Sequence, residues 1–171
     1  MHDTSTPSNW VVKHARRIKP GGDILDIASG QGRHTRYLLG LGYRVMALDL
    51  NIEPLTDLDD NPDAAVMAAD LENGPWPLGN ATFDGIVVVN YLWRPLFPHI
   101  RDAIAPGGVV IYETFQHGNE AFGRPSNPDF LLKENELREE FADFDILDFE
   151  AGEEGGDRPT VKQKICAVKP A

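Results

Sequence analysis

The sequence predicts an α/β domain built around a parallel sheet, and three observations support this fold class. Short apolar runs alternate with helical patterns along most of the 171 residues. Residues 83–90 (FDGIVVVN) form a nearly continuous β-branched run, which is typical of a strand buried on both faces of a parallel sheet. Residues 23–42 (DILDIASGQGRHTRYLLGLG) indicate a strand, a glycine turn and a helix. The other elements are predicted around this unit.

Apolar spacing and turn residues place these elements in chain order. The first half is predicted as a flexible lead (1–7), a helix from Ser8 or Asn9 to Pro20, the unit 23–42, a strand (43–50), a polar helix or turn from Asn51, and a strand (64–70). The second half is predicted as a loop (72–80), the strand 83–90, a helix (93–105) interrupted by Pro95 and Pro98, a turn (106–108), a strand (109–115), a loop (116–129), a helix from Asn135, and two strands (144–149 and 161–168) around an acidic turn (152–156).

Two of these predictions need a reason. Residues 64–70 (AAVMAAD) score as helix by propensity, but their short length and their place in the alternation favour a strand. The loop 116–129 is too long to be a simple connector, and loops of this length are often functional.

The amino-acid composition limits which classes of partner and which cellular compartment we expect. With 27 acidic and 16 basic residues, the chain carries a formal net charge of −11 and should repel a long polyanion. Its lone cysteine, Cys166, cannot form an intrachain disulfide, which suits a reducing compartment. No apolar stretch approaches the ~20 residues that a membrane span needs. We therefore expect a soluble cytoplasmic protein, a monomer or homodimer, with one domain over residues 1–171 and neither membrane nor nucleic acid partners.

The glycine turn indicates a nucleotide-like cofactor. Gly30 and Gly32 let the backbone approach a ligand, and the free N–H groups of the following helix point at it. A dinucleotide fingerprint would need a third glycine at position 35, which is Thr35. Asp26 lies in the strand, four residues before Gly30. Its carboxylate would repel a pyrophosphate but suits a cofactor that carries an ammonium and a sulfonium group.

Polar side chains at the ends of the apolar runs should face one crevice, because the carboxyl ends of parallel strands meet at one edge of the sheet. With Asp26 in the first strand, they are Asp49, Asp70, Asn90 and Glu113. Asp49 follows Asp26 by 23 residues, near the spacing at which an acid reaches a ribose hydroxyl pair. Simpler roles stay open: Asp49 could cap a helix, Asp70 could end a strand, and Asp26 could be a buried acid that binds backbone amides.

Residues 25–32 (LDIASGQG) resemble the first motif of the class I S-adenosylmethionine (SAM)-dependent methyltransferases, and residues 83–92 (FDGIVVVNYL) are similar to their fourth. The segments NYLWRPL, IYETF and FGRPSNPDFLL resemble small bacterial methyltransferases of the tellurite-resistance type. The resemblance implies a Rossmann-like three-layer sandwich with a seven-stranded, mostly parallel sheet and an antiparallel last strand. It also implies SAM as cofactor and S-adenosylhomocysteine as product.

Carried over by position, the resemblance assigns the glycine turn to the methionine part of SAM, Asp49 to the ribose, and Asp70 with Leu71 to the adenine. Asn90 and Tyr91 should lie near the methyl group. The expected cofactor-binding residues are Asp26, Ala28, Gly30, Gly32, Asp49, Leu50, Asp70, Leu71 and Asn90.

The predicted reaction is an in-line methyl transfer to a small molecule, in which the protein mainly positions two reactants. Candidate general bases are Tyr91, Glu113 and His117, and candidate substrate-binding residues are Tyr91, Arg94 and Arg124. Either arginine could instead form a surface ion pair. No His/Cys cluster or carboxylate grouping predicts a metal site.

Three alternatives remain open. One is a nicotinamide-dependent oxidoreductase, which the missing third glycine disfavours. Another is a non-catalytic SAM-binding protein. The third is an RNA methyltransferase, for which Lys13, Arg16, Arg17 and Lys19 give the one hint of a basic face.

Overall fold

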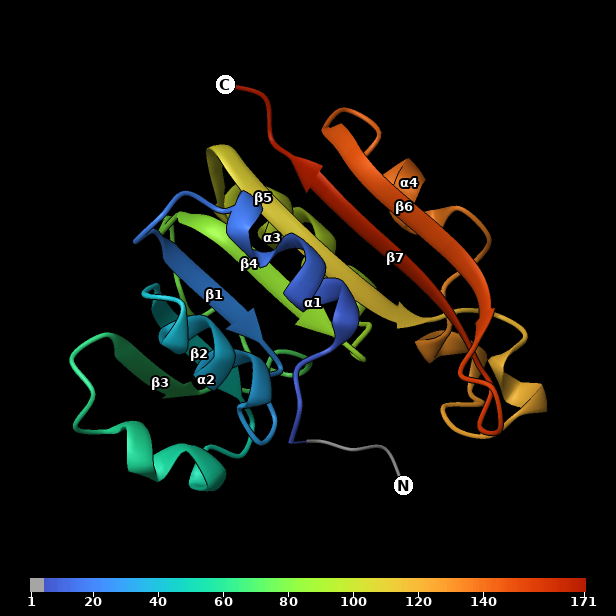
Figure 1. Cartoon of the computed structure of the whole chain (residues 1–171), viewed down its shortest axis with the longest axis horizontal. Helices are drawn as coiled ribbons and strands as arrows, with labels where there is room; N and C mark the ends of the chain where they lie inside the picture. The colour runs from blue at the N-terminus through green and yellow to red at the C-terminus, as the bar shows by residue number, and fades with distance from the viewer. Residues whose placement is uncertain (1–4) are drawn as a thin grey trace.

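Seven strands form one sheet in the computed structural model, which describes residues 5–171 (Figure 1). Along the sheet their order is β3-β2-β1-β4-β5-β7-β6. The strands are β1 (Asp23–Ile27), β2 (Arg44–Asp49), β3 (Ala64–Ala68), β4 (Phe83–Val89), β5 (Ile104–Phe115), β6 (Asp145–Glu154) and β7 (Thr160–Val168). Strands β1 to β5 pair in parallel, whereas β7 runs antiparallel to both β5 and β6. The predicted fold class, with its reversed last strand, is confirmed.

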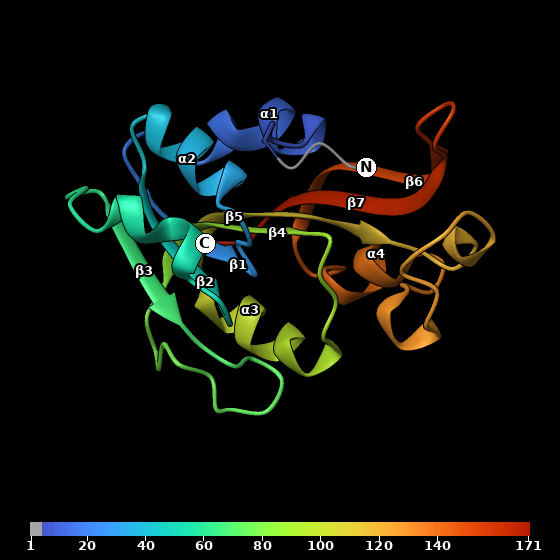
Figure 2. The same cartoon turned by 90° about the horizontal axis from the view of Figure 1, so that it is seen from below.

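Helices cover both faces of the sheet and make the outer layers of the sandwich (Figure 2). Helices α1 (Asn9–His14) and α2 (Arg33–Gly40) lie on one face, and α3 (Phe97–Ala103) and α4 (Glu136–Glu140) lie on the other. Short 3-10 turns lie at Ala15–Arg17, Glu53–Leu58, Arg94–Leu96, Asn119–Ala121 and Pro128–Phe130. No helix within residues 5–171 is both long enough and apolar enough to span a bilayer.

Each face of the sheet has its own apolar core, which explains the near-continuous apolar runs of β1 and β4. On the α1/α2 face, Trp10, Val11 and Leu38 pack against alternate strand residues such as Val87. On the α3/α4 face the core contains Leu25, Ile86, Phe97, Ile100, Leu137 and Phe141. The two cores fix the central strands and therefore the positions of their carboxyl ends.

Two proline and glycine predictions need correction. Pro95 and Pro98 do not interrupt one helix: each stands in the first turn of its own, Arg94–Leu96 and α3, where a missing N–H costs no helical hydrogen bond. The expected turn 106–108 lies inside β5. The chain stays in the sheet there because the Gly107 N–H donates to the Lys169 carbonyl at 2.8 Å, and the Lys169 N–H donates to Gly108 at 2.9 Å.

The ends of the chain also differ from expectation. Strand β6 extends into the predicted turn 152–156 and ends at Glu154, because residues 152–154 pair with residues 160–162 of β7. Residues 1–4 of the expected flexible lead lie outside the described part of the chain. The Thr6 carbonyl accepts a hydrogen bond from Arg33 at 3.0 Å. The predicted cap of α1 is Ser8, whose hydroxyl accepts from the Val11 N–H at 3.1 Å.

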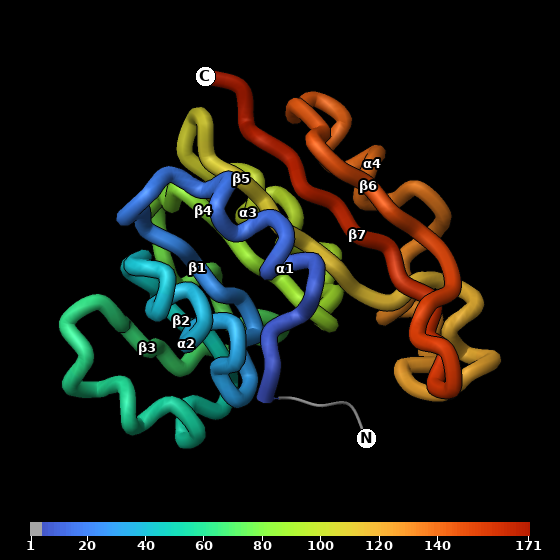
Figure 3. The backbone as a smooth tube through the Cα atoms, in the orientation of Figure 1, coloured from blue at the N-terminus to red at the C-terminus, as the bar shows by residue number. Residues whose placement is uncertain are grey.

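The order of the strands creates a crevice between β1 and β4. The chain leaves β1 through α2 toward β2, and leaves β4 through α3 toward β5, so the two connections cover opposite faces of the sheet (Figure 3). At such a switch point the loops diverge and leave room for a ligand beyond the carboxyl ends of the strands. Residues that follow β1 and β4 therefore form the centre of the candidate site.

Candidate functional site

The glycine turn after β1 has the backbone conformation that only glycine adopts easily. Gly30 has φ +58° and Gly32, which caps α2, has φ +85°. A Cβ on Gly32 would lie 2.3 Å from the Leu55 side chain, whereas a Cβ on Gly30 would meet no atom within 4 Å. Gly32 is thus required by packing, and Gly30 borders open space that a ligand can fill.

Asp49 joins the end of β2 to this turn. Its Oδ2 accepts a hydrogen bond from the Gly30 N–H at 2.9 Å, and its Oδ1 accepts from the Asn51 N–H at 3.0 Å. The side chain is half-buried, so it remains in reach of a ligand at the crevice. Asp49 does not cap the helix that follows, Glu53–Leu58, whose N-cap is Ile52, and its two hydrogen bonds instead hold it beside the glycine turn.

Most of the predicted cofactor residues meet around one cavity of about 140 Å³ at the carboxyl ends of β1, β2 and β3. Asp70 also closes the loop that follows, because it accepts hydrogen bonds from the N–H groups of Asn73 and Glu72 at 3.0 and 3.1 Å. These bonds lower the pKa of the Asp70 carboxyl. The lining residues are Ala28, Asp49, Leu50, Ala69, Asp70, Leu71, Glu72 and Tyr91.

Asp26 does not line this cavity. Its side chain points into the α1/α2 face, where it is 2% exposed and accepts a hydrogen bond from the Thr35 hydroxyl at 2.6 Å. Burial raises the pKa of Asp26 to about 7. The simpler alternative therefore describes its contacts: Asp26 is a buried acid that anchors the start of α2. Asp26 supports the glycine turn indirectly, through its hydrogen bond with Thr35.

Two residues with strained backbone stand at the ends of β1 and β4. Ala28 has φ +55° and Asn90 has φ +58°, a left-handed conformation that costs a non-glycine residue ~1–3 kcal/mol. The two strands are neighbours, with Ile27 opposite Val88, so both strained residues lie at the same switch point. Strain of this kind concentrates at functional sites, and sequence reasoning did not find it. The one available signal was an asparagine directly after a buried strand.

A second cavity of about 280 Å³ lies beyond β4 and β5 and has a largely aromatic and apolar lining. It shares Glu72 and Tyr91 with the first cavity. The Tyr112 hydroxyl fixes this point by donating to the Tyr91 carbonyl at 2.8 Å. The lining residues are Glu72, Asn90, Tyr91, Leu92, Thr114, Phe115, Pro125 and Phe130, of which sequence reasoning had named two.

The three candidate general bases occupy different environments. Burial raises the pKa of Tyr91 to about 12, so at neutral pH the phenol keeps its proton and cannot act as a base. His117 is exposed and lines neither of the two cavities just described. Glu113 is 2% exposed, its Oε2 lies 3.7 Å from Lys162 Nζ, and its Oε1 has no hydrogen-bond partner among the described residues.

A second buried polar atom at this edge lacks a partner. Ser29, in the glycine turn, has no described hydrogen-bond partner for its Oγ. Buried polar groups are nearly always hydrogen-bonded, so an unpaired hydroxyl at the end of β1 points to a missing polar ligand. Together with the open space at Gly30, it fits a ligand that carries ionic groups beside the turn.

The two predicted substrate-binding arginines differ sharply. Arg94 donates to both carboxylate oxygens of Glu136 at 2.8 Å and to the carbonyls of Asp129 and Leu131 at 2.9 Å. It therefore holds the loop before α4, as an ion pair would, and these bonds leave it little capacity for a substrate. Arg124 lines a third cavity, between the loop after β5 and the β6–β7 hairpin.

His34, in the first turn of α2, is buried and contacts the residue that caps α1. Its Nε2 accepts a hydrogen bond from the Ser8 N–H at 3.0 Å, and its ring is 4% exposed. Burial lowers the pKa of His34 to about 3, so the ring stays neutral at physiological pH. These contacts make His34 a packing residue that fixes the chain at the start of α1.

The sequence and the fold match known proteins. Residues 24–108 match a family model described as a methyltransferase domain. No curated protein matches the chain by sequence. Among solved structures, the chain resembles TehB from Haemophilus influenzae, with 22% identity and a TM-score of 0.79 over 98% of this chain. It spans only 64% of the length of TehB.

Two further solved structures share the fold. One is the 1,6-didemethyltoxoflavin-N1-methyltransferase of Burkholderia thailandensis, bound to 1,6-didemethyltoxoflavin and S-adenosylhomocysteine, with 21% identity, a TM-score of 0.70 and coverage of 95% of this chain and 76% of that one. The other is the N-methyltransferase NodS of Bradyrhizobium japonicum, with 15% identity, a TM-score of 0.68 and 94% coverage of both chains. At these identities the likeness establishes the fold.

Proposed function

We propose, from the match of residues 24–108 to a family model described as a methyltransferase domain, that the protein transfers a methyl group from SAM to a small molecule. The observation that carries the proposal is the meeting of two cavities at Tyr91 and Glu72. One cavity gathers the expected cofactor residues, and the other opens beyond β4 and β5. A donor and an acceptor placed in them would meet beside Asn90 and Tyr91.

The residues of the first cavity fit SAM. Asp49 offers two acceptor oxygens for a ribose hydroxyl pair. Asp70 and the backbone of Leu71 provide an acceptor and a donor for the edge of an adenine ring. Gly30 and Ser29 border the space for the methionine part, with an open backbone and an unpaired hydroxyl. We infer that the buried Asp26 supports this turn through Thr35 and does not touch the cofactor.

The second cavity supports a small acceptor. A volume of about 280 Å³ suits a molecule of modest size. The basic residues that hinted at RNA are largely occupied within the chain: Lys13 contacts Asp148, Arg17 contacts His14 and Lys19 contacts Asp84. These contacts give an RNA substrate no support, and the net charge of −11 opposes it.

Catalysis would depend on positioning. When bound, SAM would supply a methyl carbon activated by its sulfonium, and the sulfur would keep the C–S electron pair as the leaving group. Tyr112 holds the Tyr91 backbone at the meeting point, and the neutral Tyr91 hydroxyl can donate a hydrogen bond to the acceptor. Glu113 Oε1 is buried and unpaired but lines neither cavity, so it would take the proton that an N–H or O–H nucleophile loses through a bridging water.

Calorimetry with S-adenosylhomocysteine and a screen of labelled methyl transfer from SAM onto cell-extract fractions test this proposal. We expect micromolar binding and label on a low-molecular-mass compound. Asp49→Ala should lower the affinity more than tenfold, whereas Asp59→Ala, at an exposed position outside the cavities, should not. Absence of binding would overturn the proposal. Binding without transfer to any fraction would favour the non-catalytic SAM-binding alternative, and label on RNA would favour the RNA alternative.

A further inference from the structure

The loop between β5 and α4 exposes two aromatic side chains at the edge of the sheet that carries the site. Phe122 is 45% exposed and Phe130 is 39% exposed, although both belong to a residue type that is usually buried. Figure 1 shows this loop next to the tip of the β6–β7 hairpin. Phe130 also lines the cavity beyond β4 and β5. The loop therefore presents aromatic surface to whatever enters that cavity.

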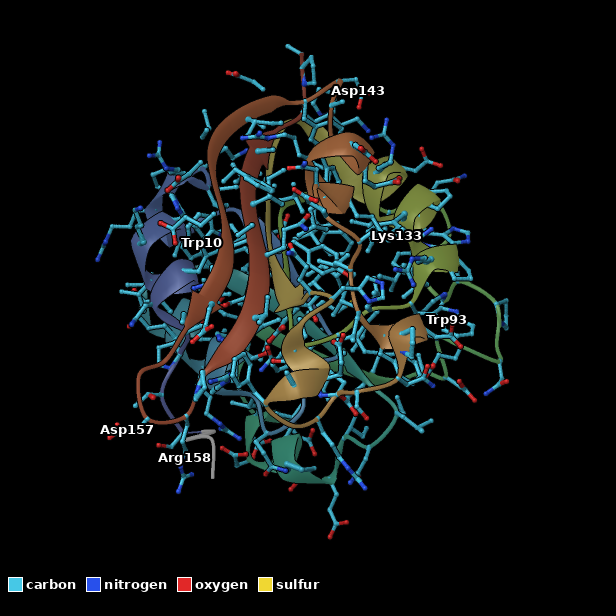
Figure 4. All side chains as sticks on the ribbon, turned by 90° about the vertical axis from the view of Figure 1, so that its right-hand side faces the viewer. Trp10, Trp93, Lys133, Asp143, Asp157 and Arg158 are labelled. Carbon is cyan, nitrogen blue, oxygen red and sulfur yellow. The ribbon has the colours of Figure 1, made fainter. Side chains whose placement is uncertain are left out.

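The third cavity, of about 280 Å³, lies between this loop and the β6–β7 hairpin. Its base is rigid: Asn119 is 1% exposed, donates to the Pro125 carbonyl at 3.1 Å and accepts from the Val161 N–H at 3.0 Å. Figure 4 shows Asp157 and Arg158 at the end of the hairpin, on the rim. The lining residues are Asn119, Phe122, Gly123, Arg124, Asp157, Arg158, Pro159 and Thr160.

Arg124 differs from the other arginines near the sheet. Arg94, Arg101 and Arg36 each bind a carboxylate through two N–H groups. Within residues 5–171, the Arg124 side chain has no ion pair and no hydrogen bond. A guanidinium without a partner at a cavity is suited to bind a carboxylate of a ligand through two parallel hydrogen bonds. In a chain of net charge −11, such a cation is a local exception.

Arg124 and Pro125 are consecutive residues, and each lines one of the two cavities. Arg124 lines the cavity at the hairpin, and Pro125 lines the aromatic cavity beside Asn90 and Tyr91. A ligand could therefore place a ring among the aromatic side chains and an anionic group against the guanidinium. The charged side chains on this lining are Arg124, Arg158 and Asp157, and their formal charges sum to +1, which suits a monoanion better than a doubly charged phosphate.

We propose that the methyl acceptor is a small planar aromatic or heteroaromatic carboxylic acid. Its ring would pack between Tyr91, Phe115 and Phe130, and its carboxylate would bind Arg124. This inference rests on the proposed function, because it identifies the acceptor of that same reaction. It makes Arg124 a specificity-determining residue, and it assigns Arg94 to the structure of the loop.

Matched pairs of ligands test the charge requirement. The probes are benzoate, salicylate, nicotinate and quinoline-2-carboxylate, each compared with its uncharged primary amide. Binding is measured by calorimetry and by saturation-transfer NMR, with and without S-adenosylhomocysteine. We expect at least one acid to bind tenfold or more tightly than its amide. A panel in which no acid exceeds its amide would overturn the proposal.

Substitutions at Arg124 test whether this residue causes the preference for the acid over its amide. Arg124→Gln should remove the preference for the acid, and Arg124→Lys, which keeps the charge but loses the planar fork, should retain part of it. The control is Arg138→Gln on α4, whose guanidinium lies 4.3 Å from the Phe149 ring centre, and it should change nothing. An acid preference that survives Arg124→Gln would overturn the proposal. Acid recognition is scored separately from binding of S-adenosylhomocysteine, so cofactor binding without acid preference refutes this inference alone.

Discussion

The Asp49 carboxylate accepts a hydrogen bond from the Gly30 N–H at 2.9 Å, and this contact ties the end of β2 to the glycine turn after β1. The two residues are 19 positions apart in the chain and come from neighbouring parallel strands. The contact holds the turn open before a ligand arrives, because Asp49 Oδ1 is fixed in turn by the Asn51 N–H. The proposed cofactor site is thus largely formed by the fold itself.

Replacing Gly30 should damage the site more than the fold. Gly30→Ala would add a methyl group to the open space beside the turn and place alanine at φ +58°. We expect the free energy of unfolding to fall by ~1–2 kcal/mol. The affinity for S-adenosylhomocysteine should fall more than tenfold, as measured by calorimetry.

Gly40→Ala is the matched control for this substitution. Gly40 lies within α2, has no positive φ, and has no atom within 4 Å of an added Cβ. It should raise stability by up to ~1 kcal/mol, because alanine is the better helix former, and leave the affinity unchanged. Equal affinities for the two variants would show that the space at Gly30 is not used by the ligand.

Asp26 should make stability depend on pH in an unusual direction. Burial raises its pKa to about 7 in the folded chain, above the ordinary value of 3.8. Between these values the folded state holds a proton that the unfolded state has released, so this contribution to stability is complete below about pH 4. It is lost as the pH rises through 7, by an amount on the order of a few kcal/mol.

The measurement is urea unfolding from pH 4 to 8 for the wild type and for Asp26→Asn, which keeps an acceptor for the Thr35 hydroxyl. The difference in unfolding free energy, wild type minus variant, should decrease with rising pH and level off above about 7. A difference that stays constant over this range would contradict the burial of an ionisable Asp26.

His34 should make stability depend on pH in the opposite direction to Asp26. Its pKa is lowered to about 3 by burial, below the ordinary 6.5, so its contribution is present above pH 6.5 and is lost as the pH falls toward 3. His34→Ala should remove this acid sensitivity and leave the Ser8 N–H without its acceptor, at a cost of ~1–3 kcal/mol. Limited proteolysis near Ser8 and acid unfolding curves would check both effects. His14→Ala, which removes another buried histidine, shows whether the proteolytic change is specific to the Ser8 contact.

The sequence allowed the placement of Asp49, Asp70 and Asn90 at one edge of the sheet to be predicted, because topology alone brings them there. It could not predict the direction of Asp26, since Leu25 and Ile27 on either side are equally buried and alternation carries no signal in such a strand. The strain at Ala28 also has no sequence signature.

The residues that line the second cavity were mostly missed for a different reason. Phe115, Pro125 and Phe130 reach the cavity from the end of β5 and a long loop, and no periodicity fixes the course of a loop. Arg94 looked available because its partner, Glu136, is 42 residues away. Contacts of this separation depend on the tertiary fold.

The last prediction concerns the unpaired oxygen of Glu113. If Glu113 Oε1 accepts the proton of the methyl acceptor, Glu113→Gln should slow transfer by ~10²-fold or more, because a neutral amide is no base. Binding of S-adenosylhomocysteine should change less than twofold, since Glu113 lies outside the cofactor cavity. Single-turnover transfer to an active extract fraction, followed across pH 6 to 9, measures this loss.

Glu154→Gln is the control, because Glu154 forms an ion pair with Lys164 on the neighbouring strand but contributes no unpaired oxygen. It should transfer methyl groups at close to the wild-type rate. Glu113→Asp, which keeps the carboxylate on a shorter arm, should lie between the two. If Glu113→Gln weakens cofactor binding as much as it slows transfer, the residue supports the fold through Lys162 and the role of base passes to the acceptor itself or to water.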